Sequence, residues 1–412
     1  MNQEIILPVS ELKAALPGLS KIVGRSKTLP VLTAVKVARD DQGQVTLQAT
    51  DLDSFATYAL KEAQPEPTTA LLLPLEHLTK SAKGLSAEDT ITLVVEGKER
   101  VKLRCAIGGS VLEQSLRTFA VEEWPVPPKV SQPATPLEPG FGLAFKQALE
   151  CCSTDPTRAN INGVFLDVTE PQSPCLVSTN GQMLFCANSF RVDLTQSVII
   201  PDSKFLEWTD LLEQTPCSVS VKPGQAAQPA KADQPERPAE PGWVKFESPC
   251  WTFLTQEIQG KFPAWRQVLP EISSLGTLIH LSGEANKQML QIIPRLPGDD
   301  SPNYPIRLRV DWQHLMLEGQ NKDEQEWTSI PIQGVRVTGK PVAVVLNRQY
   351  LAKALRFGLK QLEVEDELCP VLFSSGGKKL VIMPINLEGT PAVASVTPPP
   401  QSAQGETQKV AA

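Results

Sequence analysis

The sequence predicts an α+β protein built from three repeated domains, each with two helices packed on an antiparallel sheet. Three observations support this class. At 412 residues the chain exceeds the roughly 100 to 150 residues of a typical domain about threefold. A strand followed by an amphipathic helix recurs three times, and a second amphipathic helix begins each repeat. The hydrophobic content of 41% is sufficient for packed cores.

The recurring strand-then-helix segments are LLLPLEHLTKSAKGL, VIIPDSKFLEWTDLLEQ and VAVVLNRQYLAKALRFG. A Pro or Asn separates strand from helix in each, at Pro74, Pro201 and Asn347, so successive repeats are 127 and 146 residues apart. The longer interval contains KPGQAAQPAKADQPERPAEPG, residues 222–242. This mixture of Pro, Ala, Gln and Glu cannot bury enough apolar surface to fold, and we expect it to be a disordered insert.

The second set of helices is predicted from LPVSELKAALPGLSKIVG, FGLAFKQALECC and EANKQMLQIIPRL. In the first, Leu12, Ala15, Leu16 and Leu19 follow helical spacing, and Pro17 is expected to kink or end the helix. Alternating segments such as AVKVARDDQGQVTLQATDLDSFATYAL predict antiparallel strands joined by turns. The predicted domains are 1–128, 138–270 with the insert, and 274–388, followed by a disordered tail over 389–412.

Composition excludes several classes of protein. The amino terminus carries no export signal and no apolar run is long enough to cross a membrane, so a cytoplasmic protein that does not bind a membrane is expected. The eight cysteines form no C-x-x-C pair and are interpreted as buried, reduced thiols. His77, His280 and His314 are too scattered to predict a metal site. A net charge of −7 argues against nonspecific coating of nucleic acid.

An ordered set of motifs resembles the beta subunit of bacterial DNA polymerase III, the bacterial DNA sliding-clamp family. TLPVL at 28–32 is similar to the family's TLPIL, ATDL at 49–52 to its TDLE strand, and STNG at 178–181 to its ATDGHR segment. FPAWRQVLP at 262–270 is similar to FPDYRRVLP, and VIMPI at 381–385 to VVMPM. The chain departs from the family at Gln182, Met183 and Gln267, and it continues past the usual carboxyl terminus.

The resemblance implies a clamp without a catalytic site or cofactor, in which each chain forms half of a closed ring. Two chains would associate head to tail as a homodimer around double-stranded DNA, hold it by topology, and so give the replicative polymerase its processivity. The six predicted helices together carry +6, which leaves −13 for the rest of the chain. This distribution suits a mildly basic bore, although the fourth helix, residues 201–215, is acidic at −3.

Candidate DNA contacts are basic residues on or beside these helices. The alternative interpretation of each is an ordinary solvated surface charge. The candidates are Arg25, Lys27, Lys80, Lys83, Lys146, Arg158, Arg348, Lys353 and Arg356.

The resemblance also implies a groove that binds short peptides from the polymerase, the clamp loader and repair proteins. An apolar patch with a flexible thioether suits such anchoring. The alternative for Leu184, Val268 and Val381 is a place in the ordinary core. The predicted groove comprises Ile161, Thr179, Gly181, Gln182, Met183, Leu184, Pro263, Val268, Val381, Met383 and Pro384.

For the dimer, the family-implied faces are residues 111–119 and 292–296. The sequence gives little support to the hypothesis that the protein is an enzyme. GLSKIVGRSKT does not satisfy the phosphate-loop pattern, because Arg25 and Ser26 follow Gly24. Cys151 and Cys152 lie among core-facing residues with no paired base. The competing hypothesis is a divergent clamp paralogue that acts as a specialised partner-binding scaffold with little retention on DNA.

Overall fold

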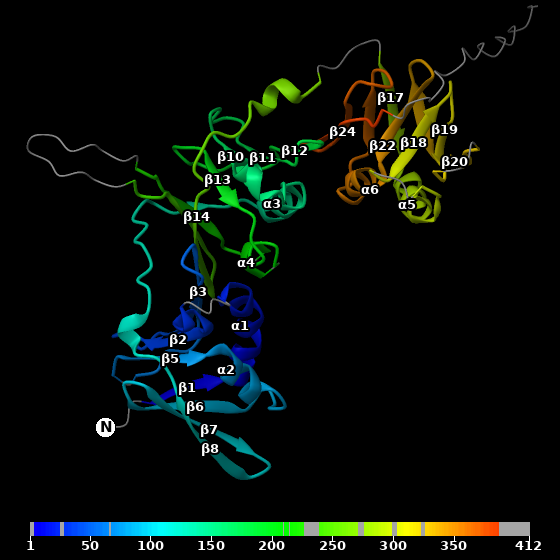
Figure 1. Ribbon diagram of the computed structural model, residues 1–412. Helices are drawn as coiled ribbons and strands as arrows, with labels where there is room; N and C mark the ends of the chain where they lie inside the picture. The colour runs from blue at the N-terminus through cyan, green and yellow to red at the C-terminus, as the bar shows by residue number, and fades with distance from the viewer. Residues whose placement is uncertain are drawn as a thin grey trace, which may run out of the picture. The chain divides into compact units, whose positions relative to one another are not determined.

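A computed structural model describes residues 4–24, 29–65, 67–208, 210–213, 215–225, 239–270, 276–298, 303–322 and 326–386. The chain divides into two compact units. The first unit comprises Met1–Asn180 and Ala187–Pro263, and the second comprises Gly181–Cys186 and Ala264–Ala412. Helices and antiparallel sheets occur in both units (Figure 1), and the predicted α+β class is confirmed. The three domain boundaries stay a prediction.

The first unit is organised around an eight-stranded antiparallel sheet of order β5-β2-β3-β4-β16-β15-β14-β9. Strands β2 and β3 alternate buried and half-buried side chains, because one face of the sheet covers the core. The strands of the sheet are β2 (Ala34–Arg39), β3 (Val45–Thr50), β4 (Ser54–Ala59), β5 (Thr69–Pro74), β9 (Thr135–Pro136), β14 (Ser218–Lys222), β15 (Trp243–Glu247) and β16 (Trp251–Gln256). The pairing of β4 with β16 joins the first two predicted repeats into one sheet.

Two smaller groups of strands complete this unit. A four-stranded sheet has the order β1-β6-β7-β8, and β13, β10 and β11 are neighbours in a further sheet. The members of the four-stranded sheet are β1 (Glu4–Pro8), β6 (Thr90–Gly97), β7 (Arg100–Ile107) and β8 (Ser110–Arg117). The members of the other group are β10 (Gly163–Asp167), β11 (Cys175–Thr179) and β13 (Val198–Pro201).

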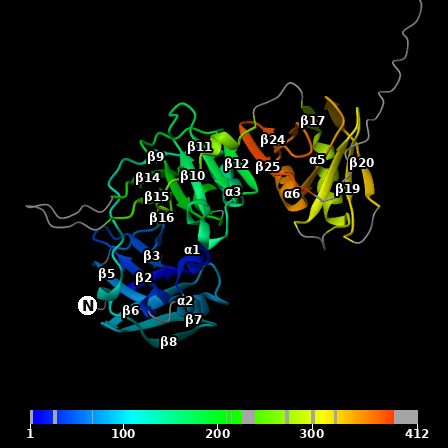
Figure 2. The same cartoon turned by 45° about the horizontal axis from the view of Figure 1, so that its top comes forward.

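The helices of the first unit pack on these sheets with their apolar sides, and α1 also packs against α2 (Figure 2). Pro17 lies inside α1 and does not end it, which corrects that alternative of the prediction. Gly18 is required there, because a Cβ would overlap the rings of Trp208 and Trp251. The helices are α1 (Val9–Ile22), α2 (Leu75–Ala82), α3 (Phe141–Leu149) and α4 (Asp210–Glu213), with 3-10 turns η1 (Pro30–Thr33), η2 (Val121–Glu123) and η3 (Pro156–Ile161).

The second unit contains neighbouring strands in the order β12-β25-β24-β23-β17-β21 and a four-stranded sheet β20-β19-β18-β22. Helices α5 and α6 pack together. Ser282 and Asn347 begin these two helices by accepting hydrogen bonds from Ala285 N and Gln349 N.

The helical elements of the second unit are α5 (Gly283–Ile292), α6 (Arg348–Arg356), η4 (Trp265–Val268) and η5 (Ile293–Arg295). Its strands are β12 (Met183–Ala187), β17 (Thr277–Leu281), β18 (Pro305–Val310), β19 (Leu315–Gly319), β20 (Thr328–Ile332), β21 (Val335–Thr338), β22 (Val342–Asn347), β23 (Gln361–Val364), β24 (Val371–Ser375) and β25 (Lys378–Ile382).

Two further expectations need correction. The predicted fourth helix is helical only over Asp210–Glu213 within the described residues. Six cysteines are buried, but Cys250 and Cys369 are partly exposed, because they lie at turns.

At the ends of the predicted insert, Gln225 and Glu240 form an antiparallel bridge. Residues 226–238 and the tail from 387 lie outside the described residues.

Candidate partner-binding and DNA-facing surfaces

Three segments of the second unit meet at Gln182. Its carbonyl oxygen accepts a hydrogen bond from Met383 N at 2.9 Å, at the end of β25. Its side-chain oxygen accepts one from the Tyr350 hydroxyl on α6 at 2.7 Å. Beyond Met383, Ile385 N donates to the Val345 carbonyl of β22 at 2.8 Å. These bonds fix the chain after β25, where several predicted groove residues lie.

The predicted groove residues of the second unit differ in exposure. Met383 is 43% exposed and Val268, at the end of η4, is 44% exposed. Gly181 and Gln182 are also exposed, whereas Pro384 is half-buried. Met183, Leu184 and Val381 are buried, so their side chains form part of the core of this unit. The exposed apolar side chains are the ones available to a peptide.

The remaining predicted groove residues belong to the first unit, and Ile161 is the last residue of η3. Ile161 and Thr179 are buried, and Pro263 is exposed. The carboxylate of Asp155 caps η3 by accepting hydrogen bonds from the Thr157 hydroxyl at 2.7 Å and its N–H at 2.9 Å. These bonds lower the pKa of Asp155 below its ordinary value.

The candidate DNA contacts fall into distinct environments. Lys80 and Lys83, at the end of α2, are exposed, as is Arg356 in the last turn of α6. Lys146 on α3 and Lys353 on α6 are half-buried. Exposed Arg158 donates a hydrogen bond to the Asn180 carbonyl at 3.2 Å. Arg25 and Lys27 lie outside the described residues.

The environment of Arg348 argues against the prediction, made from its charge, that this residue contacts DNA. Its side chain is buried, and its guanidinium donates hydrogen bonds to the carbonyls of Leu296 at 2.8 Å, Pro305 at 3.3 Å and Pro297. A guanidinium that satisfies these carbonyls holds together the chain around η5 and β18. It is a structural residue and is not positioned to meet a phosphate.

The acidic character of residues 201–215 is retained in the structure. Burial raises the pKa of Asp202 to about 6, and the neighbouring carboxylate of Glu207 adds to this shift. These acidic groups follow β13, whereas the equivalent region after β22 presents Lys353 and Arg356. The basic surface is therefore uneven among the repeats.

Strands β8 and β20 are two of the strands that end a sheet within the described residues. Strand β8 pairs with β7 alone, and its Val111 and Leu112 are 69% and 49% exposed. Strand β20 of the second unit pairs with β19 alone. In the other predicted dimer face, Ile293 and Leu296 are buried within their own unit. Open edges of this kind can accept a strand from another chain.

Sequence reasoning missed Tyr350 and the β20 edge. Tyr350 is the last residue of the segment VAVVLNRQY, but only folding brings its hydroxyl to Gln182. Among the described residues no His, Cys, Asp or Glu cluster could hold a metal ion. No helix in this part of the chain is long and apolar enough to span a membrane.

Comparison with known proteins finds relatives that cover most of the chain. Residues 5–128 match the family model described as DNA polymerase III beta subunit, N-terminal domain. The beta sliding clamp of Vibrio cholerae is 20% identical over 350 residues, covering 84% of this chain and 88% of the relative. The chain is similar to bacterial beta sliding clamps over most of its length. A second such clamp, from Pseudomonas putida, is 25% identical over 310 residues, 74% of this chain and 77% of its own length.

Solved sliding-clamp structures share the fold. The DnaN sliding clamp of Bartonella birtlesii bound to griselimycin superposes with a TM-score of 0.76 at 19% identity, covering 93% of this chain and all of that one. The DNA polymerase III beta subunit of Thermotoga maritima gives 0.73 at 17% identity, covering 93% and 99%. The repeated helix-and-sheet architecture of the clamp family is therefore present over nearly the whole chain.

Proposed function

We propose that this protein is a DNA sliding clamp that encircles duplex DNA and tethers the replicative polymerase during DNA replication. The observation that carries the proposal is the pattern of strand pairing. β4 and β16 join two repeats edge to edge, whereas β8 and β20 keep open edges within the described residues. A head-to-tail homodimer would pair these edges between copies and close a ring of six domains.

In this ring the protein performs no chemistry of its own. DNA is retained by topology, and exposed basic residues such as Lys80, Lys83 and Arg356 attract phosphates without reading bases. Arg158, Lys146 and Lys353 complete the described candidates, and Arg25 and Lys27 remain candidates from the sequence. The acidic groups at Asp202 and Glu207 keep this attraction mild. We place the protein in the cytoplasm, with the chromosome.

Partner proteins would dock through short apolar peptides at the predicted groove. Exposed Met383 and Val268 supply apolar contact area, and Gln182 offers polar groups beside Met383. The Bartonella relative is described as bound to griselimycin, which supports a ligand-binding groove in clamps of this fold. Similarity over most of the chain favours a clamp over the scaffold alternative.

The deciding experiment measures mass and DNA retention together. Light scattering after size exclusion should give a dimer. With a clamp loader present, the protein should stay on nicked circular DNA and leave once the circle is linearised. Loss from linear ends distinguishes topological binding from adhesion to phosphates. A monomer, or salt-sensitive binding that ignores DNA ends, would contradict the proposal and favour the scaffold.

A further inference from the structure

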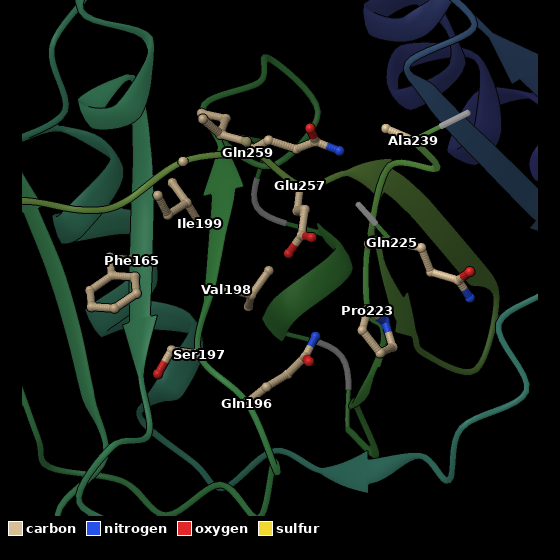
Figure 3. A pocket seen from close by; sticks show the side chains of 13 residues that line it. Phe165, Gln196, Ser197, Val198, Ile199, Pro223, Gln225, Ala239, Glu257 and Gln259 are labelled. Atoms are coloured by element: carbon tan, nitrogen blue, oxygen red, sulfur yellow. The ribbon is translucent and has the colours of Figure 1, made fainter. Parts of the chain in front are cut away.

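A cavity of about 370 Å³ opens in the first unit between β13 and the ends of β14 and β16 (Figure 3). This volume falls within the range of roughly 300 to 1,000 Å³ typical of ligand sites. One wall is apolar and comes from Phe165, Val198, Ile199 and Pro223. The polar part of the lining comes from three glutamine side chains and the carboxylate of Glu257. The cavity belongs neither to the predicted groove nor to the DNA-facing helices.

The Glu257 side chain points into this cavity, toward the side chain of Gln196 (Figure 3). Its backbone N–H donates to the Gly242 carbonyl at 3.0 Å, which fixes the root of the side chain. The carboxylate accepts a hydrogen bond from the Gly224 backbone. Glycine is needed at both positions, because a Cβ at Gly242 would lie 2.8 Å from the backbone nitrogen of Gly224, and one at Gly224 would lie 2.9 Å from that of Gly242.

The described lining of the cavity supplies no positive charge to the Glu257 carboxylate. None of the lining residues that the structure describes is Lys, Arg or His. Burial is the main cause that raises the pKa of Glu257 above its ordinary value. A half-buried carboxylate with a single backbone donor retains lone pairs that a cationic ligand can use.

The equivalent position in the first repeat is a threonine, and the lining of the cavity beside it includes Lys98 and Glu122. There, Thr118 N donates to the Glu99 carbonyl at 2.9 Å, as Glu257 N does to Gly242, and the cavity is about 400 Å³. The Thr118 hydroxyl is satisfied by the carbonyl of Leu72 on β5, the counterpart of β13. The fold therefore tolerates a small, internally bonded side chain at this position. The carboxylate of the second repeat is an addition that the fold does not require.

We propose that this cavity binds the guanidinium group of an arginine side chain on an extended segment of a partner protein. The aliphatic part of the arginine would lie along Val198, Ile199 and Pro223, and the guanidinium would face Glu257. Arginine suits the site better than lysine, because its planar guanidinium can donate two parallel N–H bonds to the Glu257 carboxylate, with the Gln196 amide nearby. This site is distinct from the proposed apolar peptide groove.

The test uses the full-length protein with ¹³C-labelled isoleucine and valine methyl groups, observed by NMR. The probe is the peptide acetyl-Ala-Arg-Ala-amide, and its control is the same peptide with citrulline, a neutral isostere of arginine. Binding should shift the methyl signals of Val198, Ile199 and Ile258, which line the cavity. Loss of one charge-assisted pair should weaken binding of the citrulline peptide about tenfold.

The matched protein variants are Glu257→Gln, which keeps the shape of the side chain, and Glu88→Gln, which removes an exposed carboxylate elsewhere in the first unit. The first should lower arginine-peptide affinity about tenfold and the second should leave it unchanged. Equal affinity for arginine and citrulline on the unmodified protein would overturn the proposal, even if Glu257→Gln failed to fold. The assay contains no DNA, so its outcome is independent of the clamp function.

Discussion

Strands β4 and β8 are both sheet edges of the first repeat, yet their surroundings differ. β4 is covered by β16, and Tyr58, Trp251 and Phe253 are buried at that joint. β8 has no second neighbour among the described residues, and it exposes Val111 and Leu112. The same kind of backbone edge is thus closed within the chain at one place and left open at another. Under the proposed function, the open edge of β8 would pair with a second copy of the chain.

The largest effect is expected from breaking the closed joint with Trp251→Ala. Trp251 is buried against Tyr58, Phe205 and Trp208, with ring centroids 5.0 to 5.4 Å away. Removing a buried tryptophan should lower the free energy of unfolding by about 3 to 5 kcal/mol. Denaturant unfolding at one fixed protein concentration measures this. Trp312→Ala, at a 37% exposed position, is the control, and an equal loss there would contradict the assignment.

The next effect concerns the open edge and the variant Val111→Lys. A lysine on an edge strand opposes pairing with another chain, so the dimer should dissociate at least about tenfold more readily. The free energy of unfolding of the single chain should change by less than about 0.5 kcal/mol, because Val111 is exposed. Sedimentation equilibrium gives the dissociation constant. An unchanged dimer would show that β8 is not the interface.

A smaller change at the closed joint is Tyr58→Phe. The Tyr58 hydroxyl donates to the Glu11 carboxylate at 2.8 Å, and losing this bond should cost about 1 kcal/mol. Burial, with the adjacent Glu11, raises the pKa of Tyr58 above its ordinary value. The folded state therefore holds this proton more tightly than the unfolded state, and stability should fall as pH rises above about 10. Denaturant unfolding at several pH values should therefore show a smaller loss of stability above about pH 10 for Tyr58→Phe than for the unmodified protein.

The smallest effect is expected for Glu113→Gln on the open edge. Glu113 pairs with Arg104 at 2.7 Å and with Lys102 at 3.9 Å, all on a solvent-facing surface. Exposed ion pairs are screened by salt, so the midpoint of unfolding should shift slightly at low salt and not at high salt. The measurement is made at a protein concentration at which the chain is a monomer. A large shift that persisted there in high salt would mean that Glu113 is not exposed in the single chain.

Periodic patterns in the sequence allowed much of the fold to be predicted. Features that depend on contacts between distant segments could not be predicted in this way. The segments LLLP and VAVVLN predicted β5 and β22 with the helices that follow, because their apolar runs and punctuation are local. The segment 201–215 carries similar punctuation, but its described helix has only four residues. Arg348 shows the limit of counting charge, since the sequence gives no sign of the three carbonyls around it.

Sites assembled from distant segments were the least predictable. The Gln182 hydrogen bonds connect residues 182, 350 and 383, and only the family resemblance placed two of these three in one groove. Glu257 had no signal in the sequence, because its neighbours Ile199, Gly224 and Gly242 are separated from it by up to 58 residues. A single carboxylate within a strand-rich region has no spacing from which a pocket can be predicted.

The antiparallel bridge between Gln225 and Glu240 also has a practical use. Gln225 N donates to Glu240 O at 2.8 Å and Glu240 N donates back at 2.9 Å, so the chain leaves and re-enters the sheet at one place. Lengthening a segment whose ends are already held together adds only about 0.6 kcal/mol for each doubling. A fluorescent domain could be inserted between these two residues to follow the protein in living cells, without disturbing the strands on either side.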